Sequence, residues 1–324
     1  MTNYQLPNYK NMNESTSNST GYDTSDDHRS GFVAVIGRPN VGKSTLINAL
    51  LQEKINIVSP KPQTTRSRQL GILTTAEFQI VFMDTPGLMQ PRHKLDEFMV
   101  ETAVESLNEA DVVLWLVDGS EPIGPGDKAI AEMVAQVDET IPVVLAINKS
   151  DVTAPENVMP HTEAYRALAP EAAWIFFSAQ EGNGRSDLLN LIVQALPEGP
   201  RYYPADQITD IYVRDMAAEF IREQVMLQLR DEIPYGVAVQ VDQFKERDNG
   251  VTYIGANIFV ERDNHKAIVI GAKGSQLRKI GAAARKELET LVDGKVFLEL
   301  WVKVEPKWRH NERALKRLGY SKPE

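Results

Sequence analysis

The chain of 324 residues contains no cysteine. Disulfides, thiolate metal sites and cysteine nucleophiles are therefore excluded, and the absence agrees with a reducing compartment. No stretch approaches the roughly 18 consecutive apolar residues that a membrane-spanning helix needs. Basic residues are also fewer than acidic ones, 35 against 45, which gives a net charge of −10. Such a chain does not coat nucleic acid unselectively, so any nucleic-acid contact has to come from a local basic patch.

Large apolar side chains are scarce at the beginning of the chain. Residues 1–30 contain no Val, Ile, Phe or Trp and are rich in Asn, Ser, Thr and Asp. Such a segment cannot bury enough apolar area to offset its ordering entropy, so we expect a disordered tail. It has neither the apolar core of a signal peptide nor the arginine content of a transit peptide. We therefore expect a cytoplasmic protein.

Short apolar runs alternate with helical patterns over residues 31–197. The runs are FVAVIG (32–37), QLGILTTA (69–76), FQIVFMD (78–84), VVLWLVD (112–118), VVLAIN (143–148) and WIFFS (174–178). Continuous apolar strands alternating with helices predict an α/β domain, with a mostly parallel sheet covered by helices on both faces. In such sheets ligands bind beyond the carboxyl ends of the strands.

A change of pattern separates this domain from the rest. Residues 198–210 are a predicted linker, because the stretch from 196 to 210 holds three prolines and a glycine. Residues 211–324 predict a smaller α+β domain with a basic C-terminal tail. Its expected elements are a helix near 211–231, strands at 237–244 and 251–260, a strand-like run HKAIVI (265–270), a helix at 275–292 and a strand at 295–304.

A phosphate-binding motif, G-x-x-x-x-G-K-[ST], lies between the first predicted strand and a predicted helix that opens at Lys43. The glycines let backbone N–H groups surround phosphate oxygens, Lys43 adds a point charge to the β- and γ-phosphates, and the Ser44 hydroxyl can bind Mg²⁺. Such a match arises by chance in about 1% of chains of this length. The predicted loop comprises Gly37, Arg38, Pro39, Asn40, Val41, Gly42, Lys43, Ser44 and Thr45.

Further motifs close later strands. In DTPG (84–87), the Asp can hold the Mg²⁺ water shell and the Gly can sense the γ-phosphate. In NKSD (148–151), Asp151 can accept hydrogen bonds from the ring N–H and the exocyclic amine of guanine, which adenine does not offer there. Each motif alone is usually a turn, but together, with the weaker SAQEGNG (178–184), they predict a guanine-nucleotide site. The added residues are Asp84, Thr85, Pro86, Gly87, Leu88, Asn148, Lys149, Asp151, Ser178 and Ala179.

These motifs resemble those of Ras-like P-loop GTPases, which implies GTP or GDP and Mg²⁺ as ligands. QTTR (63–66) lies where that family keeps its first switch and its metal-binding threonine. Thr64 and Thr65 are both candidates, and we favour Thr65; the alternative is ordinary loop chemistry. The predicted metal contacts are then Ser44, Thr65 and, through water, Asp84.

One position departs from many members of that family. Leu88 stands where they have the glutamine that orients the attacking water, so we expect slow intrinsic hydrolysis. In related GTPases an Asn at the position of Asn40 helps to bind K⁺, and the alternative is that Asn40 hydrogen-bonds only to its own loop. The predicted catalytic residues are Lys43, Thr65 and Asn40.

A second site is predicted around the loop GAKG (271–274). A GxxG loop with helices on both sides resembles the KH module, which clamps about four single-stranded nucleotides. A lone GxxG is usually a helix-entry turn. Residues 262–322, however, carry 15 basic and seven acidic side chains, a local net charge of +8 against −18 for the remainder. The tail 301–319 interleaves Trp with Lys and Arg, which suits base stacking and phosphate contact, the alternative being a solvated helix. The predicted RNA contacts are Gly271, Ala272, Lys273, Gly274, Arg278, Lys307, Trp308 and Arg309.

Over residues 31–320 the order of motifs resembles the Era family of bacterial GTPases. QTTR, DTPGL, the linker LPEGPxxYPxD, VIGAKG and VKVEPKWR carry this resemblance. It implies a monomeric, GTP-switched factor that binds small-subunit ribosomal RNA near its 3′ end and assists assembly of the 30S subunit and rRNA processing. It also implies peripheral contact with the inner membrane. The alternative is a GTPase acting on protein or membrane partners, with the second domain used for dimerisation.

Overall fold

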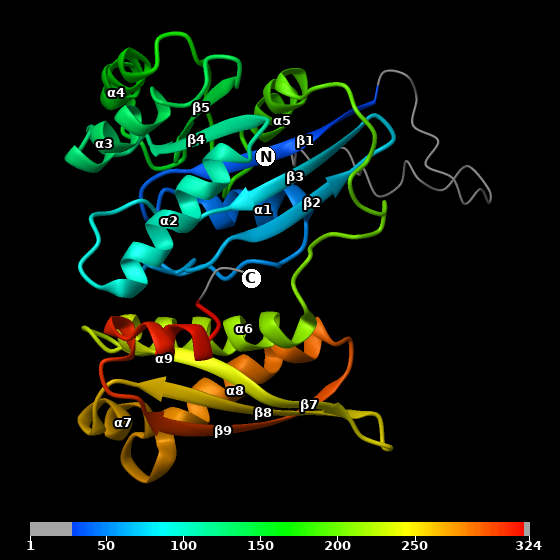
Figure 1. Ribbon diagram of the computed structural model, residues 1–324, viewed down its shortest axis with the longest axis vertical. Coiled ribbons are helices and arrows are strands. Elements are labelled where there is room, and N and C mark those ends of the chain that lie inside the picture. Colours follow the sequence, from blue (N-terminus) through cyan, green and yellow to red (C-terminus); the bar gives the residue numbers. More distant parts are fainter. Residues whose placement is uncertain (1–27, 321–324) are drawn as a thin grey trace, which may run out of the picture. The chain divides into compact units, whose positions relative to one another are not determined.

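The computed structural model describes residues 28–320, so the tail expected at 1–30 lies almost entirely outside the described residues. The chain divides into two compact units, shown in Figure 1. The first unit takes the residues up to 55 with 67–89 and 100–210, and the second takes 56–66, 90–99 and the residues from 211 onward. The predicted domains, 31–197, the linker 198–210 and 211–324, are each one continuous segment, whereas both compact units combine several segments of the chain. The predicted boundaries stay a prediction.

The first unit is built on a six-stranded sheet with the order β2-β3-β1-β4-β5-β6. Its strands are β1 (Arg29–Ile36), β2 (Gln69–Thr74), β3 (Phe78–Asp84), β4 (Val112–Asp118), β5 (Val143–Asn148) and β6 (Ala173–Phe176). Only the β2–β3 pair is antiparallel among these neighbours. Strands β3 and β4 are buried along their whole length, which explains why their sequences are apolar without alternation.

Helices connect these strands and cover the sheet. They are α1 (Lys43–Leu51), α2 (Lys94–Asn108), α3 (Pro125–Val134), α4 (Pro155–Leu168) and α5 (Arg185–Ala195). The entry to α3 shows how the sequence sets such a helix: Pro125 takes the first position, and the Asp127 carboxylate accepts from the Gly124 N–H at 2.8 Å. Because β1, β3, β4 and β5 are parallel, their carboxyl ends meet at one edge, and the predicted nucleotide motifs begin there.

The second unit contains a three-stranded sheet with the order β7-β8-β9, accompanied by helices. The strands are β7 (Ala238–Glu246), β8 (Val251–Val260) and β9 (Lys295–Val304), and the helices are α6 (Val213–Gln228), α7 (Asp263–Ile270), α8 (Ser275–Leu291) and α9 (Glu312–Arg317). The strand-like interpretation of HKAIVI was wrong, since this run forms most of α7. The reason is topological: β8 and β9 are parallel, so the chain between them has to cross over, and α7 and α8 make that crossover.

Helices cover one face of this sheet, and a second cluster of buried residues, which includes Phe259 and Trp308, lies at one end of the other face. Helices α6 and α8 pack on each other and on the strands, and α8 lies behind the sheet in Figure 1. Ile254, Ala256 and Ile258, at alternate positions of β8, are fully buried beneath the helices. None of the helices within residues 28–320 combines the length and the apolar character needed to cross a membrane.

Candidate functional site

The predicted phosphate loop connects β1 to α1. Lys43 Nζ donates to the carbonyl oxygens of Gly37 and Arg38, each at 3.1 Å. Burial lowers the pKa of Lys43 to about 8, and the negative charge of Asp84 opposes that shift. The loop needs glycine at 42, where φ is +105° and an added Cβ would lie 2.4 Å from Asn148 Nδ2. The lysine is therefore held inside a tightly curled loop, as phosphate binding requires.

Ser44 and Asp84 are brought together as the sequence predicts. Ser44 Oγ donates to Asp84 Oδ2 at 2.7 Å, and Asp84 is fully buried at the end of β3, beside β1. Gly87 lies directly against the phosphate loop, because a Cβ there would come within 2.7 Å of the Pro39 nitrogen. A hydroxyl and a carboxylate are the hard oxygen donors that Mg²⁺ prefers. Within residues 28–320 no three His, Cys, Asp or Glu side chains form a metal cluster, so a metal at this pair needs phosphate and water as further ligands.

Asn148 joins the phosphate loop to the loop after β6. Its Nδ2 donates to the carbonyl oxygen of Val41 at 2.8 Å, and its Oδ1 accepts from the Ala179 N–H at 2.8 Å. The neighbouring Asp151 accepts from Ser178 Oγ at 2.6 Å. The three motifs, far apart in sequence, thus form one connected structure in which the carboxylate of Asp151 is held by the loop that should also face the base.

Only the backbone of Arg38 is part of the phosphate loop, because its side chain points to α3. Its Nε donates to Asp127 Oδ1 at 2.8 Å, on α3, and its guanidinium also approaches Glu121 at 3.5 Å. Burial acts to lower the pKa of Arg38, but the charge and hydrogen bond of Asp127, together with Tyr165, raise it on balance. The side chain is therefore committed to α3, and a nucleotide contact from Arg38 is left to its main chain.

The predicted switch segment QTTR lies in the second unit. Thr64 Oγ1 donates to the Lys61 carbonyl at 2.7 Å, and the Thr64 carbonyl accepts from the buried Arg222 of α6. Thr65 is nearly buried, with 8% of its surface exposed. The choice of Thr65 over Thr64 as the metal ligand stays a prediction.

The loop GAKG has the backbone form that the glycines predict. Gly271, Lys273 and Gly274 all have positive φ, at +71°, +50° and +75°. Arg278 holds the loop from the first turn of α8, because its Nη2 donates to the Lys273 carbonyl at 2.6 Å. Helices lie on both sides of the loop, as in the KH pattern that the sequence resembles.

A groove of about 490 Å³ opens beside this loop. One wall is α8, with Arg278 and Arg285, together with the loop residue Gly274. The other wall is the edge strand β9, with Phe297 and Leu300. The small residues Gly281 and Ala282 keep the space between the walls open. Arginine at the rim and apolar atoms along the walls suit a single strand with its phosphates outward and its bases inward.

The predicted RNA contacts in the C-terminal tail do not all face outward. Lys307 is exposed and lines a hollow with His310 and Arg313. Trp308, however, is fully buried: its Nε1 donates to the Gly236 carbonyl at 2.9 Å and its ring stacks on Tyr320. Base stacking by Trp308, as predicted from the sequence, does not fit this geometry, because neither face of the ring is open.

Arg309 is also engaged within the second unit. Its Nη2 donates to Glu261 Oε2 at 2.6 Å, and its Nη1 lies 3.2 Å from His93 Nε2. Its side chain is 17% exposed, so a phosphate contact there has to compete with the ion pair to Glu261. Of Lys307 and Arg309, the exposed Lys307 is better placed to contact an RNA phosphate.

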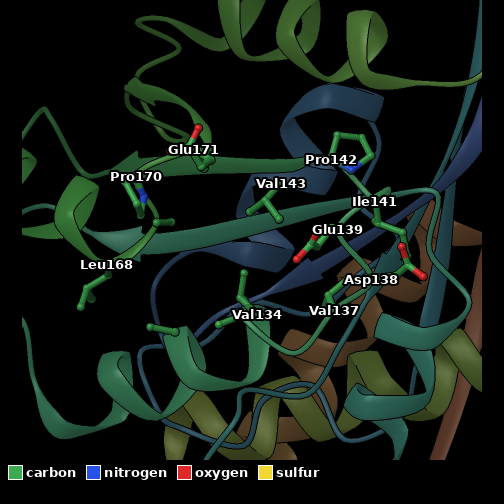
Figure 2. Close-up of a pocket in the computed structure, with 14 residues that line it drawn as sticks. Val134, Val137, Asp138, Glu139, Ile141, Pro142, Val143, Leu168, Pro170 and Glu171 are labelled. Carbon is green, nitrogen blue, oxygen red and sulfur yellow. The ribbon is translucent and has the colours of Figure 1, made fainter.

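A separate hollow of about 490 Å³ lies in the first unit (Figure 2). It is bounded by the end of α3 and the beginnings of β5 and β6, and its walls include Val134, Val137, Leu168 and Pro170, with Asp138 at the margin. These are the amino ends of the strands, whereas the nucleotide motifs lie at the carboxyl ends. The residues that line this hollow all lie outside the predicted site.

Comparison with known proteins assigns both units. A family model described as a 50S ribosome-binding GTPase matches residues 32–149, and a KH-domain model matches residues 232–309. GTPase Era of Halothermothrix orenii is 48% identical over 293 residues, which cover 90% of this chain and 99% of that protein. GTPase Era of Geobacter metallireducens is 50% identical over 294 residues, covering 90% of this chain and 98% of that protein.

The chain belongs to the Era family of GTPases.

Solved structures of Era agree with this assignment. A crystal structure of Era in complex with MgGDPNP and nucleotides 1506–1542 of 16S ribosomal RNA matches with a TM-score of 0.88 and 41% identity, covering 91% of this chain and 100% of that one. A single-residue variant of Aquifex aeolicus Era bound to GDP·AlF₄⁻ matches with a TM-score of 0.86 and 40% identity, again over 91% and 100%. The predicted fold class and GTPase activity are thereby confirmed. The dimerisation alternative is not favoured.

Sequence reasoning missed several residues of these sites. Asp118, at the end of β4, pairs with Lys149 Nζ and so positions the lysine of NKSD. Its signal was available, since an acidic residue ends an apolar run one strand away from NKSD. Asp127 was harder to find, because only the fold brings α3 to Arg38. Gly281, Ala282 and Arg285 could have been noticed as small and basic residues on one side of the helix after GAKG.

Proposed function

We propose that this Era-family chain binds GTP with Mg²⁺, hydrolyses it to GDP and phosphate, and holds small-subunit ribosomal RNA in the groove beside GAKG. Lys43 and the backbone N–H groups of residues 37–45 bind the phosphates, and Ser44 binds the metal directly. Asp84 contacts the metal through water, and Thr65 supplies a further ligand from the first switch. The metal neutralises charge that develops on the phosphate oxygens.

Base selection is assigned to the loops that Asn148 connects. Asp151 accepts from the guanine N–H donors, and the backbone N–H of Ala179 lies in the loop that faces guanine O6. Lys149 lines the same pocket, held by Asp118. Asn148 itself is proposed as the residue that fixes these loops rather than as a base contact, because both ends of its amide are already engaged by protein backbone.

The Leu88 side chain cannot orient the water that attacks the γ-phosphate, because it has no polar atom and is packed in the core with 6% of its surface exposed. Slow intrinsic hydrolysis follows from that. Asn40, in the phosphate loop with φ +66°, is proposed to bind K⁺ near the phosphates and so to raise the rate.

The RNA site is proposed to consist of the GAKG loop and the groove between α8 and β9. Lys273 and Arg278 approach phosphates, the glycines allow the backbone of the strand to come close, and Lys307 adds a charge from the tail. The solved Era complex with 16S ribosomal RNA supports the same partner for this chain. The proposed role is assistance to 30S assembly and rRNA processing, by a monomer.

The proposed subcellular location is the cytoplasm, where the small ribosomal subunit is assembled. Peripheral contact with the inner membrane is proposed on the family resemblance alone. The domain boundaries at 31–197 and 211–324 are proposed as the limits of the GTPase and KH regions, and the two matching family models, 32–149 and 232–309, fall inside them.

The observation that carries this function is the junction at Asn148, which binds the phosphate loop and the base loop together. The experiment that tests it measures phosphate release by the purified chain with Mg²⁺ and GTP, ATP or XTP. We expect release from GTP to exceed that from ATP and XTP by at least about 100-fold, because adenine and xanthine do not present to Asp151 the two donors that guanine presents. Equal release from GTP and ATP would contradict the assignment of the base pocket.

A further inference from the structure

The sheet of the second unit has an outer face, turned away from α6 and α8. Alternate residues of each strand point to it, and the register places them side by side: Tyr253 pairs with Phe297, Gly255 with Glu299 and Asn257 with Trp301. One end of this face is covered, because Phe259 packs into a cluster with Trp308 and α9. The other end carries Phe297 and Trp301, which are exposed, and Tyr253, which is half-buried.

Aromatic rings dominate the exposed end. Tyr253 and Phe297 are stacked, with ring centres 6.0 Å apart and an angle of 23° between the rings. Phe297 is 49% exposed and Trp301 is 42% exposed. Gly255 lies between the rings, since an added Cβ would be 3.2 Å from Tyr253 Oη and 3.3 Å from Trp301 Cζ3. Glycine at this position gives the Tyr253 and Trp301 side chains room to lie close to the strand, opposite the β-bulge between Val241 and Gln243.

The charge around these rings is positive. The Arg247 guanidinium lies 4.6 Å from the ring centre of Tyr253 and 5.0 Å from that of Phe297. The other basic residues at alternate positions of the outer face are exposed; they are Lys245, Lys295 and Lys303. The two acidic residues of the face have polar partners there: Glu299 accepts from Tyr253 Oη at 2.7 Å, and Asp242 accepts from Asn257. Four basic groups against two acidic ones favour a polyanion.

The outer face is continuous with the groove beside GAKG. Strand β9 is the edge of the sheet, and its residues Phe297 and Glu299 line that groove as well as belonging to the outer face. A strand held between α8 and β9 therefore needs only to pass over this edge to reach the aromatic rings. Along β9 the distance from Phe297 to Trp301 is roughly 13 Å. Successive bases of the RNA can therefore meet successive aromatic rings.

We propose that Trp301, with Phe297 and Tyr253, forms a stacking surface for further bases of the RNA strand that the GAKG groove holds. This inference rests on the proposed RNA-binding function and extends its footprint beyond the four nucleotides of the clamp. The occupant is single-stranded RNA, because exposed aromatic rings beside Arg and Lys bind bases by stacking and phosphates by charge without needing a defined sequence.

The test compares RNA length. Fluorescence anisotropy of the full chain is measured with labelled single strands of four, six, eight and ten nucleotides, all sharing the same four-nucleotide core. Wild type is expected to bind the eight-nucleotide strand at least about 10-fold more tightly than the four-nucleotide strand, from one or two added stacking contacts. Trp301→Thr keeps a strand-forming residue and should lose most of this gain, with its four-nucleotide affinity unchanged within twofold.

Two further variants make the test specific. Trp301→Phe keeps a ring and should retain most of the length gain, which separates stacking from damage to the fold. Trp174→Thr removes an equally exposed tryptophan from β6, in the first unit, and should retain all of it. A full length gain in Trp301→Thr, or an equal loss in Trp174→Thr, overturns the proposal. Failure of wild type to bind any of the strands contradicts the proposed RNA function itself.

Discussion

Replacing Asn148 by alanine removes the two hydrogen bonds, each 2.8 Å long, that connect the phosphate loop to the loop after β6. The groups left behind are the carbonyl of Val41 and the N–H of Ala179, in residues that are 1% and 2% exposed. A buried polar group without a partner costs about 1–3 kcal/mol. Partial entry of water lowers the sum for two groups to an expected value of about 2–4 kcal/mol.

This loss should appear mainly in nucleotide affinity, because the nucleotide requires both loops in their joined positions. At about 1.4 kcal/mol for each factor of ten, GDP and GTP affinity should fall between about 30-fold and 1,000-fold. Titration calorimetry of the purified variant with GDP, GTP and XDP measures it. The matched control is Asn157→Ala, on α4 and outside the site, which should change affinity less than twofold.

The ratio of affinities for the two bases distinguishes positioning from recognition. If Asn148 only joins the loops, affinity for GDP and XDP should fall by the same factor in Asn148→Ala. A change in the GDP-to-XDP ratio comparable to that of an Asp151 variant would refute the positioning role. Affinity for GDP within twofold of wild type would refute the junction altogether.

Four further outcomes are expected at the two sites. Asp151→Asn turns an acceptor oxygen into a donor facing guanine donors, so GTP affinity should fall by ~3 kcal/mol or more in a titration while xanthine nucleotide binds relatively better; unchanged GTP affinity contradicts the base contact. Lys43→Ala should slow GTP hydrolysis at least ~10²-fold in a phosphate-release assay, because it removes charge stabilisation of the transition state; parental turnover would place the site elsewhere. Exchanging K⁺ for Na⁺ at constant ionic strength should slow turnover, and Asn40→Ala should abolish that difference; a rate indifferent to the cation leaves Asn40 with a structural role. Replacing Ala272 and Lys273 together with Asp adds repulsion at the clamp and should weaken RNA binding at least ~10-fold at moderate salt, with GTP affinity in the absence of RNA unchanged; RNA binding that survives both changes rules out GAKG as the clamp.

Local patterns were sufficient to predict most of the first unit. The runs 78–84, 112–118 and 143–148 are strands over the predicted residues, because continuous apolar sequence of that length is stable only between two layers of helices. The contact of Ser44 with Asp84 was predictable for the same reason: parallel strands bring their carboxyl ends to one edge.

Errors arose where a distant segment decides the environment of a residue. Trp308 stands in a basic tail, yet Arg66, far earlier in the chain, lies over its ring at 5.6 Å, and Tyr320 stacks on it. The sequence around Trp308 does not indicate that Arg66 and Tyr320 will contact its ring. The side-chain partner of Arg38 was missed for a similar reason, because its ion pair with Asp127 depends on where the sheet positions α3.

The run HKAIVI shows a different limit. Its β-branched and apolar residues favour a strand, and the structure has a helix there, α7. The parallel pairing of β8 with β9 requires a crossover, and this tertiary demand outweighs the local preference, which spans only about 1 kcal/mol.

The most direct test of the central claim is ultraviolet crosslinking of the full chain to RNA, with GTP analogue or GDP bound, followed by mapping of the crosslinked nucleotides and residues. We expect crosslinks near the 3′ end of small-subunit ribosomal RNA, at residues of the GAKG groove, and more of them with the GTP analogue than with GDP. Crosslinks spread evenly over unrelated RNA, or the same yield in both nucleotide states, would contradict a GTP-switched factor that recognises this RNA.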